Sequence, residues 1–365
     1  MKITAITTNL LRLPFPHDGP PLLFAGKPRN GMEMLLLRVD TDEGITGWGE
    51  AFGPGIWPAT RATIETLIAP LCIGQDATRI EVLHDDILRK LHPLGRSGPV
   101  LFALSGLDIA LWDIAGKRAG MSIARLLNPQ AGAALPGYAS LLRYTDPALV
   151  ARKAAAALLR GYRAVKLHEI GVPQARAARE AIGAGVPLMM DTNCPWTPEE
   201  ALAVAAQLRD LDLFWLEEPV WPPDDVAGLA RVRAAAGMPV AAGENAGSLQ
   251  DFAQLLNAGA VDYIQPSIIK MGGVTGLRRV FELAGKHAVP VAPHSPYFGA
   301  GFIATLHVCA AFGGNAMIER YFCDLDASPF GRAIDPVNGV FRVPDGPGLG
   351  VEPDPAVLQR YGDAA

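Results

Sequence analysis

The chain has 365 residues, half of them hydrophobic and 19% charged, so it can bury a large core and is not expected to be disordered. Its formal net charge of −5 gives no basic surface for nucleic acid. We find no signal-peptide pattern, no continuous apolar stretch long enough to span a membrane, and no metal-type or redox-type spacing among the four cysteines. We therefore expect a cytoplasmic protein with reduced thiols and with neither nucleic acid nor membrane as a partner.

The N-terminal part, residues 1–130, is predicted to form an α+β module. Residues 34–39 are almost all apolar, and residues 45–50 follow an Asp-Glu-Gly turn signal, a pattern typical of a β-hairpin. From residue 60 to about 127 the apolar residues recur at helical spacing. Strands followed by helices indicate an α+β arrangement.

Two irregular segments, residues 14–29 and 51–59, interrupt this module and are too long for simple turns. Long loops in compact domains are usually functional or disordered. Phe24 and Trp57 lie in these segments. Together with Tyr138, in the next predicted strand, they are candidates for lining a substrate pocket.

Strand-like and helix-like segments alternate from about residue 136 onwards. The residues that end the strands are separated by 23 to 27 positions, from the second strand to the eighth: Lys166, Asp191, Glu217, Glu244, Ser267, His294 and Glu319. This interval accommodates one strand, one loop and one helix, so it indicates an internal repeat of a βα unit. We expect an α/β barrel over residues 131–330, with residues 331–365 returning to the first module. The carboxyl ends of such strands share one face, where active sites form.

Three of the strand-end residues are acidic: Asp191, Glu217 and Glu244. Three carboxylates on one barrel face would repel each other unless a cation lay between them. Carboxylate oxygens are hard ligands that favour Mg²⁺ or Mn²⁺ over zinc. The sequence therefore predicts a divalent metal site built from these residues.

Three basic residues accompany the acids. Lys166 and His168 are two positions apart on one strand, so their side chains lie on the same face. His294 ends the seventh strand, on the opposite side of the barrel from Lys166. We interpret all three as candidate catalytic residues, although His168 could equally be satisfied by a backbone carbonyl.

Two further polar residues could contact a substrate. Asn193 follows Asp191 by two positions and could donate a hydrogen bond to a substrate or close its own loop. Glu319 ends the eighth strand and could hydrogen-bond the substrate if it is protonated, as a buried carboxyl can be. Glu218 alternates away from Glu217 and is expected to form a structural ion pair.

This combination of residues resembles the mandelate racemase subgroup of the enolase superfamily. The resemblance rests on Lys166-x-His168, Asp191-x-Asn193, Glu217-Glu218-Pro219, Gly243-Glu244-Asn245, Lys270-x-Gly272-Gly273, His294, Ile318-Glu319-Arg320 and the helical stretch 105–113. It implies a modified (β/α)7β barrel with an N-terminal α+β capping domain, and one Mg²⁺ held by the three acids. It also implies a homo-oligomer, from dimer to octamer, that removes the proton α to a carboxylate of a small-molecule substrate. Residues 14–29 and 51–59 would then be specificity lids.

The chain departs from that subgroup at two positions. The subgroup commonly has Lys-x-Lys on the second strand, and this chain has Lys166-x-His168. An aspartate usually ends the sixth strand and supports the seventh-strand histidine, and here Ser267 stands in its place. A serine can orient His294 but brings no charge, so we expect His294 to be a weaker base and two-base racemisation to be disfavoured.

The mechanism that these residues favour is a metal-assisted β-elimination. Lys166, kept neutral by desolvation, would remove the α-proton while Mg²⁺ holds the substrate carboxylate. His294 or His168 would then protonate the leaving oxygen, and His294 as the base is the alternative. A leaving hydroxyl would make the protein an acid-sugar dehydratase, and a leaving ring oxygen a lactone or anhydro-sugar cycloisomerase. A racemase or epimerase, and a non-catalytic sugar-acid-binding protein, are the less favoured alternatives.

Overall fold

The computed structural model describes residues 1–314 and 316–363. Its N-terminal part contains a three-stranded antiparallel sheet of β1 (Ile3–Pro14), β4 (Gly31–Thr41) and β5 (Thr46–Ala51), with β4 in the middle. The predicted hairpin at residues 34–50 is β4 and β5, paired in register from Leu35 opposite Ala51 to Asp40 opposite Thr46. Helical segments follow: α1 (Trp57–Thr63), a π-helical turn (Ile64–Ile68), α2 (Ala69–Cys72), α3 (Ile80–Leu91), α4 (Pro99–Ala119) and α5 (Ile123–Leu127).

Helix α4 packs directly on the capping sheet and joins it to the barrel. A Cβ atom at Gly49 of β5 would lie 1.9 Å from the carbonyl oxygen of Gly106, so the strand and the helix approach closely only because glycine is present. On its other side, Ser105 Oγ accepts a hydrogen bond from Gly272 N at 2.8 Å, and Asp108 Oδ1 accepts one from Thr275 N at 2.9 Å. Helix α4 is long and apolar enough to span a membrane, but 78% of its most apolar window is buried inside the molecule, as expected of a core helix.

The two irregular segments of the N-terminal part contain more structure than the sequence indicated. Within residues 14–29 the chain forms a short antiparallel hairpin of β2 (Leu23–Phe24) and β3 (Lys27–Pro28). Helix α1 already begins at Trp57, with Pro58 in its first turn, so only residues 52–56 form the second loop. The helical region therefore begins three residues before the predicted start at residue 60.

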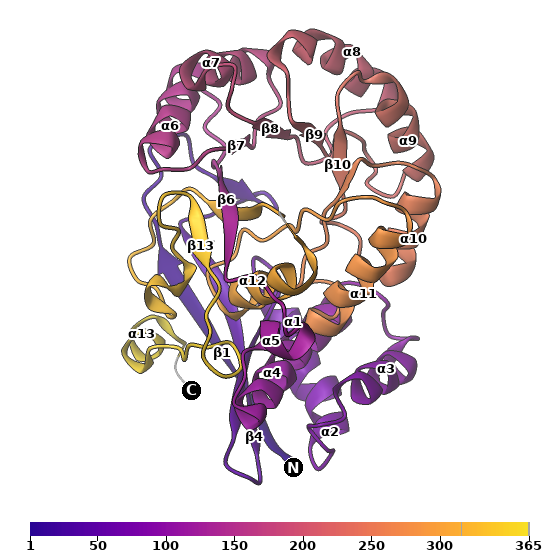
Figure 1. Cartoon of the computed structure of the whole chain (residues 1–365), viewed down its shortest axis with the longest axis vertical. Coiled ribbons are helices and arrows are strands. Elements are labelled where there is room, and N and C mark those ends of the chain that lie inside the picture. Colours follow the sequence, from indigo (N-terminus) through magenta and orange to yellow (C-terminus); the bar gives the residue numbers. More distant parts are fainter. Residues whose placement is uncertain (315, 364–365) are drawn as a thin grey trace.

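The second part is a curved parallel sheet ringed by helices (Figure 1). Its strand order is β11-β10-β9-β8-β7-β6-β12, so consecutive strands are neighbours from β6 to β11 and β12 returns beside β6. The strands are β6 (Ala134–Ser140), β7 (Val165–Leu167), β8 (Leu188–Asp191), β9 (Trp215–Glu217), β10 (Val240–Ala242), β11 (Tyr263–Ile264) and β12 (Ile318–Tyr321). The helices are α6 (Pro147–Leu159), α7 (Val172–Ile182), α8 (Pro198–Leu208), α9 (Val226–Ala235), α10 (Leu249–Asn257), α11 (Gly273–Lys286) and α12 (Ala300–Phe312). The fold class expected from the βα repeat is confirmed.

The predicted seventh strand, residues 290–294, is reduced to a single bridge. Val291 pairs with Ile264 of β11, and His294 N donates to the carbonyl oxygen of Pro266 at 3.1 Å. The segment therefore runs parallel to β11 and occupies the position of a strand without a continuous ladder. Pro290 and Pro293 lack an N–H, which prevents regular pairing.

Local sequence signals determine where several barrel helices begin. Thr197 and Glu200 form a reciprocal capping box at the start of α8, as predicted from the Thr-Pro-Glu-Glu sequence. Asp146 caps α6, whose first residue is Pro147.

The C-terminal segment lies across both parts of the molecule. It contains a 3-10 turn (Gly331–Ile334), β13 (Val340–Arg342), which pairs antiparallel with β6, and α13 (Pro355–Tyr361). Beyond α13, the Asp363 carboxylate accepts a hydrogen bond from Leu10 N in β1 at 3.0 Å and pairs with Arg61. These contacts attach the end of the described chain to the capping sheet.

Candidate active site

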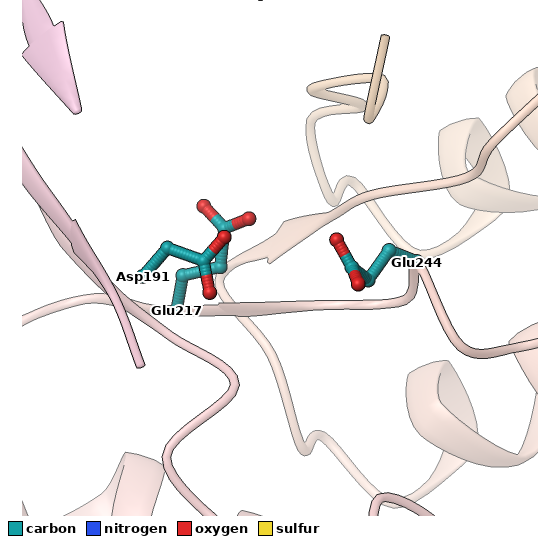
Figure 2. A group of neighbouring side chains, drawn as sticks. All are labelled: Asp191, Glu217 and Glu244. Atoms are coloured by element: carbon teal, nitrogen blue, oxygen red, sulfur yellow. The ribbon is translucent and has the colours of Figure 1, made fainter. Parts of the chain in front are cut away.

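Three carboxylates converge at the carboxyl ends of neighbouring strands. Asp191 and Glu217 are the last residues of β8 and β9, and Glu244 follows β10 after one glycine. One oxygen of each carboxylate lies within 4.8 Å of the others (Figure 2). The side chains of Asp191 and Glu217 are fully buried, whereas 14% of the Glu244 side chain is exposed. The structure thus brings together the three acids that were singled out from their spacing.

The backbone beside these carboxylates is held in an uncommon conformation. Asn193, Cys194 and Glu218 have φ angles of 54°, 55° and 47°, in the left-handed region. Strained conformations of this kind cluster at functional sites, where surrounding contacts stabilise them. Here Asn193 donates through its backbone N and its Nδ2 to Asp191 Oδ1, at 3.1 and 3.0 Å, and so orients that carboxylate.

The cluster has the donor chemistry of a divalent cation site. Burial raises the pKa of Glu217 well above its usual value, and the adjacent Asp191 carboxylate raises it further. The ionised carboxylates therefore repel each other unless positive charge is added. All the available donor atoms are carboxylate oxygens, which suit Mg²⁺ and not a soft metal. The residues therefore fit the Mg²⁺ that the resemblance implied.

Lys166 lies within this cluster as a counter-charge. Its Nζ is 2.7 Å from Glu217 Oε1, 2.8 Å from Glu319 Oε1 and 3.2 Å from Asp191 Oδ2, and its side chain is fully buried. Burial alone would lower the pKa of Lys166, but these carboxylates raise it well above its usual value. These contacts favour a charged ammonium, whereas the sequence favoured an amine kept neutral by desolvation, His168 and the metal.

Glu319 also differs from its expected state. Ser140 Oγ donates to its Oε1 at 2.8 Å and Ser295 N to its Oε2 at 3.1 Å. Burial would raise the pKa of Glu319, but Lys166 and the nearby histidines lower it below its usual value. Its contacts are those of an ionised carboxylate that accepts from Ser140, Ser295 and Lys166, so the condition under which Glu319 would donate to a substrate is not met here.

His168 lies at one side of the carboxylate cluster and faces the cavity. Its Nδ1 is 2.6 Å from the carbonyl oxygen of Leu141, and its Nε2 is 3.2 Å from Asp191 Oδ2. A carbonyl oxygen can only accept, so Nδ1 carries a hydrogen and the lone pair of the neutral ring is at Nε2. The backbone contact considered for His168 is present, and it orients the ring toward the site.

His294 lies at the other side of the cluster. Its Nε2 is 2.7 Å from Glu244 Oε2, and its Nδ1 is 3.3 Å from Ser267 Oγ and 3.2 Å from Tyr297 Oη. The serine that replaces the expected aspartate therefore does contact the imidazole, in company with a tyrosine. The Glu244 carboxylate can only accept, so Nε2 carries a hydrogen, whereas the two hydroxyls can either donate to Nδ1 or accept from it.

A cavity of about 990 Å³ opens above these residues, between the barrel and the capping domain. Its polar floor includes His168, Asn193, Glu244 and His294. Its opposite wall is largely apolar and comes mainly from the capping domain, through Leu22, Leu23, Phe24, Met32, Met34, Phe52, Ile56 and Phe102. Phe24 thus lines the pocket as predicted from its loop.

The other two predicted aromatic residues lie elsewhere. Trp57 packs against the capping-domain core, and the guanidinium groups of Arg12 and Arg61 are both 5.1 Å from its ring centre. Tyr138 is fully buried inside the barrel, with its ring edge-on to Trp215 at 5.9 Å. Both assignments as pocket residues need correction, because tertiary packing directs these rings into cores.

Several cavity residues were not identified from the sequence, among them two tyrosines and two arginines. Tyr297 contacts His294, and Tyr321 lies against His168 with 5.6 Å between ring centres. Arg29 and Arg143 also line the cavity. Only Tyr321 had a usable sequence signal: it is two positions after Glu319 on β12, so strand alternation places it on the same face.

Comparisons with known proteins agree with this arrangement. Residues 6–128 match the N-terminal domain of the mandelate racemase / muconate lactonizing enzyme family, and residues 149–357 match the enolase C-terminal domain-like family. The chain is 34% identical over 387 aligned positions to D-galactarolactone cycloisomerase of Agrobacterium fabrum, covering 99% of each chain. It is 30% identical to arabinonate dehydratase of Saccharolobus solfataricus, covering 93% of each.

One similar solved structure contains magnesium. A racemase from Streptomyces coelicolor with bound magnesium superposes with a TM-score of 0.85 at 28% identity, covering 99% of this chain and all of that one. The fold, the capping domain and the sequence matches thus agree over nearly the whole length. The chain belongs to the mandelate racemase / muconate lactonizing enzyme family of the enolase superfamily and is an enzyme of the lyase or isomerase kind found there.

Proposed function

We propose that this enzyme removes the proton α to the carboxylate of a sugar acid and then eliminates the β-oxygen, with His168 as the base and His294 as the acid. The observation that carries this proposal is the placement of two imidazoles at opposite sides of the carboxylate cluster, both lining one cavity. Mg²⁺ held by Asp191, Glu217 and Glu244 would bind the substrate carboxylate and stabilise the negative charge that develops when the proton leaves.

His168 is better suited than Lys166 to accept the proton. Its Nδ1–H is fixed by the carbonyl oxygen of Leu141, so Nε2, beside Asp191 and the cavity, is the nitrogen that would accept the proton. Lys166 makes three contacts with carboxylates, has no exposed surface and is not among the residues that line the cavity. Its role is to hold the acids together.

His294 is the group available to protonate the leaving oxygen. The C–H bond breaks and its proton passes to His168, the electron pair forms a C=C bond, and the β C–O bond breaks as its oxygen takes a proton from His294. The resulting enol becomes a 2-keto acid. When the oxygen leaves as water, the reaction is that of an acid-sugar dehydratase.

The apolar wall of the cavity favours a second candidate, a cycloisomerase acting on a lactone or an anhydro sugar. Hydroxyl groups of an open-chain acid that faced Phe24, Met34 and Phe52 would be buried without hydrogen-bond partners, which is unfavourable. A sugar ring presents a C–H face to such side chains. The relative with 34% identity is named as a lactone cycloisomerase, in line with this alternative.

Proton NMR of substrate panels in D₂O with Mg²⁺ tests the proposal. Conversion of an open-chain acid to a 2-keto-3-deoxy acid identifies a dehydratase, and conversion of only the ring form identifies a cycloisomerase. Exchange of the α-proton without elimination would contradict both and indicate racemisation. We also propose a cytoplasmic homo-oligomer, and light scattering of the purified protein gives its subunit number.

A further inference from the structure

Two arginine side chains line the cavity without a carboxylate partner. Within residues 1–314 and 316–363, neither Arg29 nor Arg143 has a guanidinium nitrogen within 4.0 Å of a carboxylate oxygen. Of the other half-buried arginines in the described residues, Arg61, Arg278 and Arg279 pair with carboxylates, and Arg179 instead donates to four backbone carbonyl oxygens. A half-buried guanidinium beside apolar side chains is unfavourable unless an anion neutralises it. The absence of a protein anion at these two residues points to one supplied by a ligand.

Arg29 is held by neutral groups only. Its Nη2 is 2.9 Å from the sulfur of Met32, and its guanidinium lies 5.4 Å from the ring centre of Phe24 and 5.9 Å from that of Tyr321. These contacts orient the guanidinium without using most of its five N–H donors. Arg29 can therefore still bind a carboxylate through two hydrogen bonds.

Arg143 also lines the cavity, beside the backbone of His168. Its Nε donates to the carbonyl oxygen of His168 at 2.8 Å and its Nη2 to Asn193 Oδ1 at 3.3 Å, which leaves the Nη1 donors free. The imidazole of His168 and the guanidinium of Arg29 both lie within 6 Å of the Tyr321 ring centre. Positive charge is thus gathered beside the proposed base.

The remaining cationic residue of the cavity, Lys270, lies apart from this pair. Its Nζ donates to the carbonyl oxygen of Glu244 at 2.9 Å and lies 5.0 Å from the ring centre of Phe52. Lys270 therefore belongs to the side of the cavity next to the third metal ligand. Among the described residues, the other lysine and arginine side chains that line the cavity are Arg29, which lies over Tyr321, and Arg143, which contacts the backbone of His168.

We propose that Arg29 and Arg143 bind a second carboxylate, so that the substrate is a dicarboxylic sugar acid or its monolactone. This inference rests on the proposed function, in which the first carboxylate is at the metal cluster. In an open diacid the second carboxylate is present from the start. In a monolactone it forms during the reaction: the β C–O bond breaks, the electron pair goes to the leaving oxygen, and that oxygen becomes part of a carboxylate.

Calorimetric titration in Mg²⁺ with matched acids tests the subsite. Galactarate and galactonate differ only in whether C6 is a carboxylate or a hydroxymethyl group, and glucarate and gluconate provide a second such pair. We expect the diacid of at least one pair to bind about 10- to 100-fold more tightly, the range expected for a charge-assisted bidentate contact. Arg29→Met should reduce diacid affinity to that of the monoacid and leave the monoacid unchanged, and Arg29→Lys should retain part of the difference.

Arg38→Met is the matched control, because Arg38 is also a capping-domain arginine but lies over Trp48 and pairs with Asp40, none of which lines the cavity. It should leave both affinities unchanged. Equal affinities for diacid and monoacid, or an equal loss for both in Arg29→Met, would overturn the subsite. Tighter binding of 6-phosphogluconate than of either diacid would show that the arginines bind phosphate, and would also overturn it.

The outcomes separate this inference from the proposed function. A diacid preference that depends on Arg29, without α-proton exchange in D₂O for any acid, would support the subsite and refute the elimination chemistry. Exchange and elimination without a diacid preference would support the elimination chemistry and refute the subsite.

Discussion

Replacing Lys166 with methionine tests its role as the cation that holds the buried acids together. Its Nζ lies between 2.7 and 3.2 Å from oxygens of Glu217, Glu319 and Asp191, and all four side chains are fully buried. Removing one partner of such a buried ion pair costs about 3–5 kcal/mol, because the remaining charges lose their compensation. We therefore expect Lys166→Met to lower the free energy of unfolding by that amount in the absence of Mg²⁺.

Urea unfolding followed by circular dichroism, with EDTA and then with excess Mg²⁺, measures this effect. A cation bound among Asp191, Glu217 and Glu244 supplies positive charge to the same acids, so Mg²⁺ should stabilise Lys166→Met more than the unmodified enzyme. The double variant Lys166→Met/Glu319→Gln should lose less than the sum of the two single variants, since it removes a charge of each sign.

Lys153→Met is the matched control. Lys153 pairs with Asp18, whose side chain is 61% exposed, and such surface pairs contribute at most about 1 kcal/mol. The reasoning would be refuted if Lys166→Met proved as mild as this control, or if the double variant showed no coupling. In either case Lys166 would not act as the counter-charge of the cluster.

Three further predictions concern the base, the metal and pH. His168→Asn should reduce kcat by about 10²- to 10⁴-fold, the usual contribution of a general base. It should also abolish α-proton exchange in D₂O while the Mg²⁺-induced rise in Tm persists. Retained exchange would exclude His168 as the base. Glu217→Gln should abolish that rise in Tm, and a rise equal to that of the unmodified enzyme would place the metal elsewhere. Glu50 lies in β5 and accepts a hydrogen bond from Gly301 N at 2.8 Å. Burial raises the pKa of its carboxyl to about 7. Between about pH 4.5 and 7 the folded state keeps a proton on Glu50 that the unfolded state has lost. The free energy of unfolding is therefore highest with respect to this group below about pH 4.5, and it decreases by roughly 3 kcal/mol as the pH rises through 7. Glu50→Gln should flatten the stability profile between these pH values, and an unchanged slope would contradict the assignment.

Much of the architecture could be predicted because it depends on patterns that are local or periodic. The 23- to 27-residue spacing of strand-end residues identified the barrel, since each βα unit repeats the same length of chain. The same spacing identified Asp191, Glu217 and Glu244, because the ends of parallel strands share one face whatever the details of packing. The capping box at Thr197 and the hairpin of β4 and β5 followed from residues that are neighbours in sequence.

The protonation states could not be predicted from local patterns. Lys166 and Glu319 are 153 positions apart, yet they form an ion pair that favours the charged form of both, and no pattern within either strand reveals this pair. The pKa of a buried group depends on which charges the fold places beside it, and those come from distant strands. The assignment of the base therefore changed from Lys166 to His168 once the contacts were known.

The sequence by itself determined the family, the barrel and the carboxylate cluster, because each depends on residue type and spacing along the chain. Only the tertiary structure decided which side chains face the substrate. Trp57 and Tyr138 are aromatic residues near predicted loops and strand ends, but both pack into cores, whereas Arg29 and Tyr297 reach the cavity without any periodic signal. The direction of a side chain from a loop is set by contacts between the capping domain and the barrel, and these contacts form only when the chain is folded.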